Sequence, residues 1–253
     1  PNLDFSQSHP QGLPLWPLLF ITLSCGAVSG FHSTQSPLMS RCIKNEKHGR
    51  LIFYGAMITE GIIALIWATV GLSLYEPQAL QNLIVEGTAA LVVNETAINL
   101  LGSVGGFLAI LGVIVLPITS GDTAFRSARL IISEAAHLPQ RDALKRLYIA
   151  VPLFVIGFII SQLDFSLIWR YFGWSNQTLA TLVLWSSAIY LAKEKKFHWI
   201  ASLPATFLTA IVTTFICYAK IGLHLNYNIS LIVGIFVATT SFIVFLIANR
   251  KWK

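Results

Sequence analysis

The sequence predicts an all-α membrane protein, a polytopic bundle of about seven transmembrane helices. Its 253 residues are 55% hydrophobic and only 11% charged, whereas soluble domains carry about 25% charged residues. The apolar residues lie in long runs, without the segments of about ten alternating residues that are typical of a membrane barrel. These observations exclude a soluble domain and a nucleic-acid-binding module, and they predict the lipid bilayer as the main partner.

Basic residues alternate between the loops of the predicted bundle. Fifteen of the 17 Lys and Arg residues lie in the first, third and fifth loops and in the C-terminal tail. Because Lys and Arg stay on the cytoplasmic side, the N-terminus of the chain is expected outside and the C-terminus inside. The predicted spans are 15–33, 51–75, 98–117, 147–163, 175–192, 199–219 and 229–248.

The organisation of the chain follows from this topology. We expect a single transmembrane domain over 1–253, in which 196–253 supplies two peripheral spans. An external N-terminus without a signal peptide needs an upstream span to deliver it, and the chain begins at Pro1. The sequence therefore predicts the C-terminal part of a longer protein.

The first apolar run passes into polar residues before it is long enough to cross a bilayer, which takes about 20 apolar residues. Leu15 to Val28 is followed by the polar stretch Ser29-Gly-Phe-His-Ser-Thr-Gln-Ser-Pro37. A helix that breaks at membrane depth must line a cavity or pack against protein, and such helices form substrate and ion sites in transporters. The alternative is that the span ends at Gly30 and a loop follows. We predict that substrate or ion binds at Gly30, His32, Ser33, Thr34, Gln35 and Ser36.

Glu60 is the only carboxylate inside a predicted span, about nine residues into 51–75. A charged carboxylate is costly there, so we expect Glu60 to be paired or protonated. Imidazole titrates near neutral pH, and His32 is a candidate partner in proton coupling. The alternative for Glu60 is a structural hydrogen bond to a neighbouring helix, and a structural role is likewise the alternative for His32.

Two further polar stretches have a functional and a structural interpretation. Thr119, Ser120, Asp122 and Thr123 gather oxygen ligands around a glycine, which suits a cation or gating site for Na⁺ or a proton, or else helix capping by Asp122. The stretch Gly173 to Gln177 favours an N-cap of the fifth span by Ser175 or Asn176. The three cysteines have no metal-ligand spacing, and no metal, cofactor or enzyme motif is predicted.

Six strings in this order resemble the carbon starvation protein A (CstA) family, and the resemblance covers about 15–195. They are Ser29–Pro37, Arg41–Glu46, Phe53–Met57, Glu60–Trp67, Thr119–Arg129 and Trp174–Ala180. The resemblance implies a bacterial or archaeal inner-membrane transporter that takes up peptides or pyruvate during carbon starvation, the latter with protons. It also implies an inverted-repeat, LeuT-like fold, in which the broken first span is a discontinuous helix.

The expected function is therefore secondary-active uptake of a small solute. The choices between peptide and pyruvate, and between H⁺ and Na⁺, stay open. The alternative from another class is a seven-span nutrient sensor or receptor. A third class, an intramembrane enzyme using His32 and Ser33, lacks any supporting nucleophile constellation, and the protein is not expected to be an enzyme.

Overall fold

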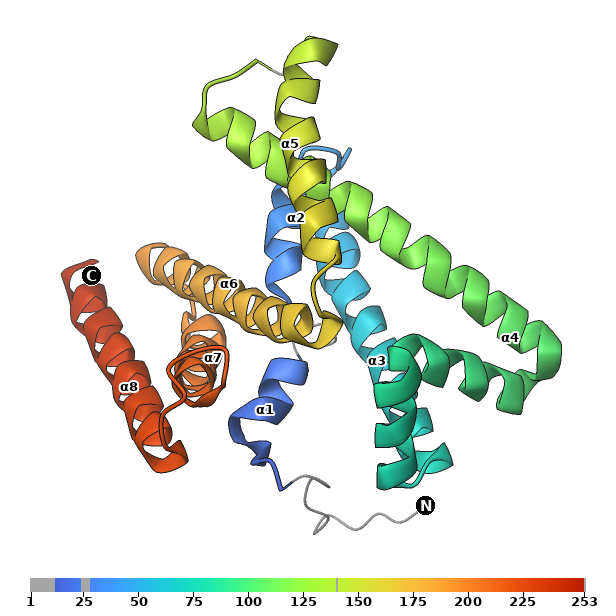
Figure 1. Cartoon of the computed structure of the whole chain (residues 1–253). Coiled ribbons are helices and arrows are strands. Elements are labelled where there is room, and N and C mark those ends of the chain that lie inside the picture. Colours follow the sequence, from blue (N-terminus) through green and yellow to red (C-terminus); the bar gives the residue numbers. More distant parts are fainter. Residues whose placement is uncertain (1–11, 24–27, 140, 253) are drawn as a thin grey trace. The chain divides into compact units, whose positions relative to one another are not determined.

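The computed structural model describes residues 12–23, 28–139 and 141–252, and all regular structure in them is helical. The predicted all-α class is confirmed for these residues. Contacts divide the chain into two compact units, each described by itself (Figure 1). Unit 1 comprises Pro1–Leu13 and Asn45–Gly157, and unit 2 comprises Pro14–Lys44 and Phe158–Lys253.

Unit 1 is built from helices that follow one another closely along the chain. Asn45 caps its first helical turn by accepting a hydrogen bond from the Lys47 N–H at 3.0 Å. Pro77 begins the longest helix, at a position where the missing N–H of proline costs nothing. The elements are η1 (a 3₁₀ turn, Glu46–His48), η2 (a π turn, Arg50–Gly55), α3 (Ala56–Leu74), α4 (Pro77–Ala135) and nearly all of α5 (Ala143–Ser161).

Helix α4 has 59 residues and bends sharply at Gly102. A straight helix of that length would measure about 88 Å, nearly three times the hydrocarbon thickness of about 30 Å. Gly102 has φ +69°, which breaks the helical path, and Figure 1 shows α4 turning back on itself. A Cβ on Gly105 would lie 2.7 Å from the Ala97 carbonyl oxygen, although eight residues of straight helix span about 12 Å. The glycines of the third predicted span therefore permit a tight helical turn.

Among the described residues, five helices are long and apolar enough to cross a membrane, and those of unit 1 leave most of their apolar side chains exposed. Leu65 is 68% exposed and Leu72 is 77% exposed, as expected of a surface that faces lipid rather than water. The chain is therefore a multi-pass membrane protein. The five helices cover Glu46–Leu74, Ala89–Ala135, Ala143–Ser161, Trp199–Tyr218 and Tyr227–Lys251.

Two of the seven predicted spans do not meet this test of length and composition. The first, 15–33, is divided between two short helices, α1 (Leu15–Thr22) and α2 (Gly30–Ser40). The fifth, 175–192, lies within α6 (Phe165–Lys193), which is long enough but less apolar. The reason is that 175–192 opens with the polar residues Ser175, Asn176 and Gln177. Seven spans thus remain a prediction.

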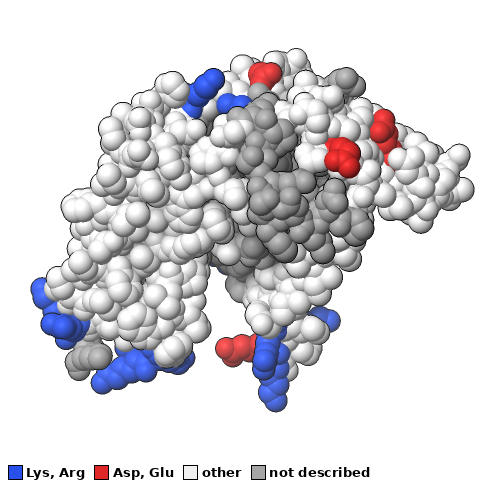
Figure 2. Space-filling model, turned by 90° about the horizontal axis from the view of Figure 1, so that it is seen from below, with Lys and Arg blue, Asp and Glu red and all other residues white. Residues whose placement is uncertain are grey.

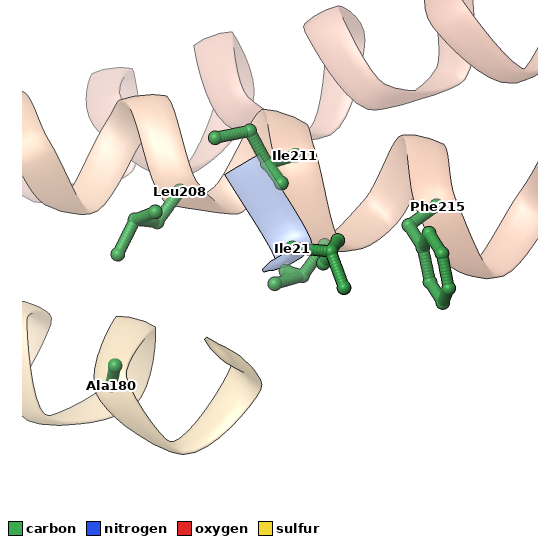
Figure 3. Packing of buried hydrophobic residues seen from close by; sticks show 6 residues of the cluster. Ile21, Ala180, Leu208, Ile211 and Phe215 are labelled. Atoms are coloured by element: carbon green, nitrogen blue, oxygen red, sulfur yellow. The ribbon is translucent and has the colours of Figure 1, made fainter. Parts of the chain in front are cut away.

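Unit 2 is organised around α7 (Trp199–Tyr218), which contacts α1, α6 and α8 (Tyr227–Trp252). We expected the sixth and seventh spans to be peripheral, yet 61% of the span in α7 is buried. Figure 3 shows Ile21 of α1 against the row of α7 side chains, with Ala180 of α6 nearby. That row consists of Leu208, Ile211 and Phe215, whose spacing puts them on one helix face.

The bend in α4 generates a matched test. Replacing Gly102 by Ala forces a side chain into a left-handed backbone, which costs about 1–2 kcal/mol, although its Cβ would meet no atom within 4 Å. Gly112 in the same helix is equally open but has ordinary helical geometry. We expect Gly102→Ala to lower the thermal unfolding midpoint in detergent, and Gly112→Ala to leave it unchanged or raise it. Equal midpoints for the two variants would contradict the bend.

Candidate functional site

The candidate site is the interruption between α1 and α2 in unit 2. Helix α1 ends at Thr22, Ser29 is extended with φ −116° and ψ 126°, and α2 begins at Gly30. In the described residues the interruption is therefore seen at Val28 and Ser29, directly before Gly30, whereas 24–27 lie outside the described part of the chain. Our expectation that the helix is broken over Gly30–Ser36 is wrong, because these residues form the first two turns of α2.

The polar side chains of α2 are compatible with a helix because they bond to its own backbone. The Thr34 and Ser36 hydroxyls donate to the carbonyl oxygens of Phe31 and His32, each at 2.7 Å, and the Ser33 hydroxyl donates to that of Gly30. A hydroxyl that donates its hydrogen in this way keeps its oxygen lone pairs for another partner. His32 to Ser36 are half-buried, so these oxygens remain candidate ligands.

Two adjacent amide side chains of α6 hold the ends of the interruption. The Asn176 Oδ1 atom accepts a hydrogen bond from the Phe31 N–H at 2.8 Å, which is one of the first-turn donors of α2 that lack a partner within the helix. The Gln177 Nε2 atom donates to the Phe20 carbonyl oxygen, near the C-terminal end of α1, at 2.7 Å. Asn176 is 6% and Gln177 2% exposed. We call this pair the amide clamp.

Gly30 lets the N-terminus of α2 approach α6 at the amide clamp. A Cβ at Gly30 would collide with the Asn176 carbonyl oxygen and lie 2.7 Å from the Leu179 Cβ atom. Real Cβ atoms do not come that close to these partners, so only glycine fits without moving a backbone. Ser29 adds a further contact, since the Asn176 Nδ2 atom donates to its hydroxyl oxygen at 3.2 Å.

Sequence reasoning missed the role of the amide clamp. We expected Ser175 or Asn176 to cap the fifth span, but α6 begins ten residues earlier and Asp164 caps it, accepting from the Leu167 N–H at 3.1 Å. The available signal was two neighbouring amides inside a helix at membrane depth, where polar residues are costly and often functional. In the described part of the chain, the buried Gln177 Oε1 atom has no hydrogen-bond partner.

The residues predicted for proton coupling lie in different units. His32 is in α2 of unit 2, and Glu60 is in α3 of unit 1. Glu60 is half-buried and lies at the centre of the candidate span Glu46–Leu74, as expected for an intramembrane carboxylate. Their pairing stays a prediction.

The predicted cation or gating residues lie on consecutive turns of α4. Asp122 pairs with Arg126 at 2.6 Å, and both side chains are more than half exposed. The Thr123 hydroxyl donates to the Thr119 carbonyl oxygen at 2.8 Å, and Ser120 is exposed. The alternative of a helix cap at Asp122 is wrong, because the helix continues through it. Among the described residues, no three His, Cys, Asp or Glu side chains gather as a metal site.

Comparison with known proteins gives these features a context. The family model of the carbon starvation protein CstA matches residues 3–100 and 76–216, which is most of the chain. The chain belongs to the CstA family. The amide clamp, Gly30, His32, Glu60 and the Thr119–Thr123 stretch all lie within the matched residues.

Three relatives match different shares of the chain. An uncharacterized protein of Haemophilus influenzae is 59% identical over 122 residues, which are 48% of this chain and 88% of that protein. The peptide transporter CstA of Escherichia coli is 26% identical over 272 residues, covering 79% of this chain and 39% of the transporter. The pyruvate/proton symporter BtsT of Escherichia coli is 46% identical over 70 residues, covering 25% of this chain and 10% of the symporter.

The chain spans about two fifths of the length of the Escherichia coli peptide transporter that it matches. No solved structure matches the chain.

The amide clamp predicts a specific loss of stability. Asn176→Ala would leave the Phe31 N–H without its acceptor, and an unsatisfied buried donor costs about 1–3 kcal/mol. The matched control is Ser186→Ala, which removes an exposed hydroxyl of the same helix that donates to the Leu182 carbonyl oxygen. Thermal unfolding in detergent should show a clear destabilisation for Asn176→Ala and almost none for Ser186→Ala. A neutral Asn176→Ala would refute the clamp.

Proposed function

We propose that the protein is a secondary-active transporter whose solute path passes the interruption between α1 and α2. One observation carries the proposal: two short helices end at an interruption that is held by buried amides of a third helix. Discontinuous helices of this kind supply the substrate and ion sites of many secondary transporters. Support for transport also comes from the relatives, which are named as a peptide transporter and a pyruvate/proton symporter.

The two helix ends provide complementary electrostatics. The C-terminal end of α1 presents backbone carbonyls and a partial negative charge, and the N-terminus of α2 presents N–H groups and a partial positive charge. A carboxylate suits the α2 end, and a cation suits the α1 end. Peptides and pyruvate both carry a carboxylate, so one site chemistry serves either substrate. The buried Gln177 Oε1 atom adds an acceptor for a donor group or a cation.

Coupling to protons is assigned to Glu60 and His32, as the sequence predicts. Glu60 is at the centre of an apolar span, where protonation removes the cost of a buried charge. The half-buried hydroxyls Ser33, Thr34 and Ser36, together with Gln35 and Gly30, complete the proposed binding segment. Thr119, Ser120, Asp122 and Thr123 are proposed as a cation or gating site on α4, for which Na⁺ is the alternative ion.

The remaining features of the proposal concern the membrane and the class of protein. We propose seven spans in an inner membrane, with the N-terminus of this chain outside and the C-terminus inside, in an inverted-repeat, LeuT-like arrangement. The basic residues of alternate loops support this orientation. We also propose that the protein has no enzymatic activity. A sensor role is not favoured, because the named relatives are transporters.

Uptake separates solute binding from coupling. The complete gene product is reconstituted in liposomes, and accumulation of labelled pyruvate and of a labelled dipeptide is measured with and without an inward proton gradient. We expect gradient-driven accumulation of one of them. Glu60→Gln and His32→Ala should abolish accumulation but leave exchange of labelled for unlabelled substrate, because exchange needs no net proton movement. Gln177→Leu should reduce both accumulation and exchange, because it is proposed to impair solute binding itself.

The matched control is Glu194→Gln, which removes an exposed carboxylate from the α6–α7 turn and should leave uptake unchanged. If accumulation by Glu60→Gln and His32→Ala equals that of the parent, the coupling roles are refuted. If neither substrate is accumulated or exchanged by folded protein under a proton or a sodium gradient, the proposal of transport itself fails.

A further inference from the structure

A pocket lies in unit 2, at the turn between α6 and α7 and beside the end of α8. This pocket is open and has a volume of about 570 Å³. Its lining combines two lysines, an imidazole, two aromatic rings and an amide. The lining residues are Ala192, Lys195, Lys196, Phe197, His198, Trp199 and Asn249.

Positive charge dominates the surroundings of this pocket. Among the described residues, five basic side chains and one acidic side chain, Glu194, lie in the turn and at the end of α8. Figure 2 shows Lys and Arg side chains gathered at its lower left, the side on which Figure 1 places the ends of α6 and α8. The N-terminus of α7 adds the partial positive charge of a helix start. The five basic residues are Lys193, Lys195, Lys196, Arg250 and Lys251.

Lys195 occupies a helix-end position at which glycine is the usual residue. The Lys196 N–H donates to the Leu191 carbonyl oxygen at 2.8 Å and the Lys195 N–H donates to that of Ala192 at 3.1 Å, which is the Schellman pattern of a helix end. In this pattern Lys195 has φ +53°, a left-handed conformation that disfavours any side chain with a Cβ. Lys195 thus combines a strained backbone with a place in the lining of the pocket, and strained residues often lie at functional sites.

His198 is held in one orientation by hydrogen bonds on both ring nitrogens. The Asn249 amide lies 3.2 Å from Nε2, and the Ser202 hydroxyl lies 3.3 Å from Nδ1. Asn249 and Ser202 are buried, and the Phe245 ring meets the imidazole edge-on at 5.2 Å. These contacts join the α6–α7 turn to α8 and give the pocket a fixed wall.

We propose that this pocket binds the phosphate group of an anionic phospholipid. The lysines and the α7 N-terminus suit a phosphate, and basic pockets between transmembrane helices bind lipid headgroups. A lipid rather than a soluble phosphate fits because apolar side chains continue from the pocket. Phe197 is 68% exposed and Ile200 65% exposed, and the Trp199 ring lies at the same end, where an acyl chain and the membrane interface would cover them.

The test uses the complete protein in an uncharged detergent. Binding of dioleoyl phosphatidylglycerol and of zwitterionic dioleoyl phosphatidylcholine is followed by native mass spectrometry. We expect preferential binding of the anionic lipid, and a loss of about fivefold in affinity for each lysine removed in Lys195→Gln and Lys196→Gln. The matched control is the double variant Lys44→Gln with Lys47→Gln, which removes the same charge from another exposed loop and should retain binding.

Lys195→Gly distinguishes a specific loss of lipid binding from a general loss of stability. Removing the left-handed lysine should raise the thermal midpoint while it weakens lipid binding, so that stability and binding move in opposite directions. His137 has φ +52° in the corresponding position after α4, and His137→Gly should raise the midpoint without changing lipid binding.

Three outcomes would overturn the proposal. The first is unchanged lipid binding by folded Lys195→Gln and Lys196→Gln. The second is an equal loss in the Lys44 and Lys47 control, which would indicate general charge attraction. The third is competition by glycerol 1-phosphate at the affinity of the whole lipid, which would assign the pocket to a soluble phosphate. None of these outcomes depends on solute transport.

Discussion

The structure of unit 2 depends on satisfying backbone groups where α1 and α2 are interrupted. In hydrocarbon every N–H and C=O needs a partner within the protein, and an interruption exposes both kinds at once. Asn176 accepts from the Phe31 N–H at the start of α2, and Gln177 donates to the Phe20 carbonyl near the end of α1. Because the two amides are adjacent on α6, one turn of a single helix fixes both ends of the interruption. Gly30 makes this geometry accessible by removing the side chain at the contact.

The same requirement explains which helices are buried. Helix α7 packs against α1, α6 and α8. Its apolar side chains contact Ile21 of α1. Helix α1 is too short to span a bilayer by itself. It therefore needs a neighbouring helix to pack against, and a helix at the periphery of the unit would not provide that contact. In unit 1 the spans leave their apolar surfaces exposed, which suits lipid. The transporter proposal thus rests on one interrupted helix supported by a buried neighbour.

Much of the helical organisation could be predicted from hydropathy and loop charge, because both act along the chain. Glu60 at a span centre and the glycines of α4 are examples. The interruption was predicted close to its true position, but Gly30–Ser36 proved helical, because hydroxyl side chains can bond to their own backbone. The partners of the amide clamp could not be predicted, since Asn176 and Phe31 are 145 residues apart and nothing local marks the partner of an amide. The αL conformation of Lys195 was equally invisible, because a lysine gives no turn signal.

The most direct test asks whether the interruption lines the solute path. In the complete protein, with Cys25, Cys42 and every cysteine outside this chain changed to Ser, Ser29→Cys would be labelled by a membrane-impermeant methanethiosulfonate in proteoliposomes that retain uptake. The remaining Cys217 is buried. The account predicts that the half-buried position 29 is labelled, and that a saturating concentration of the transported substrate slows the labelling. A labelling rate that the transported substrate leaves unchanged would contradict it.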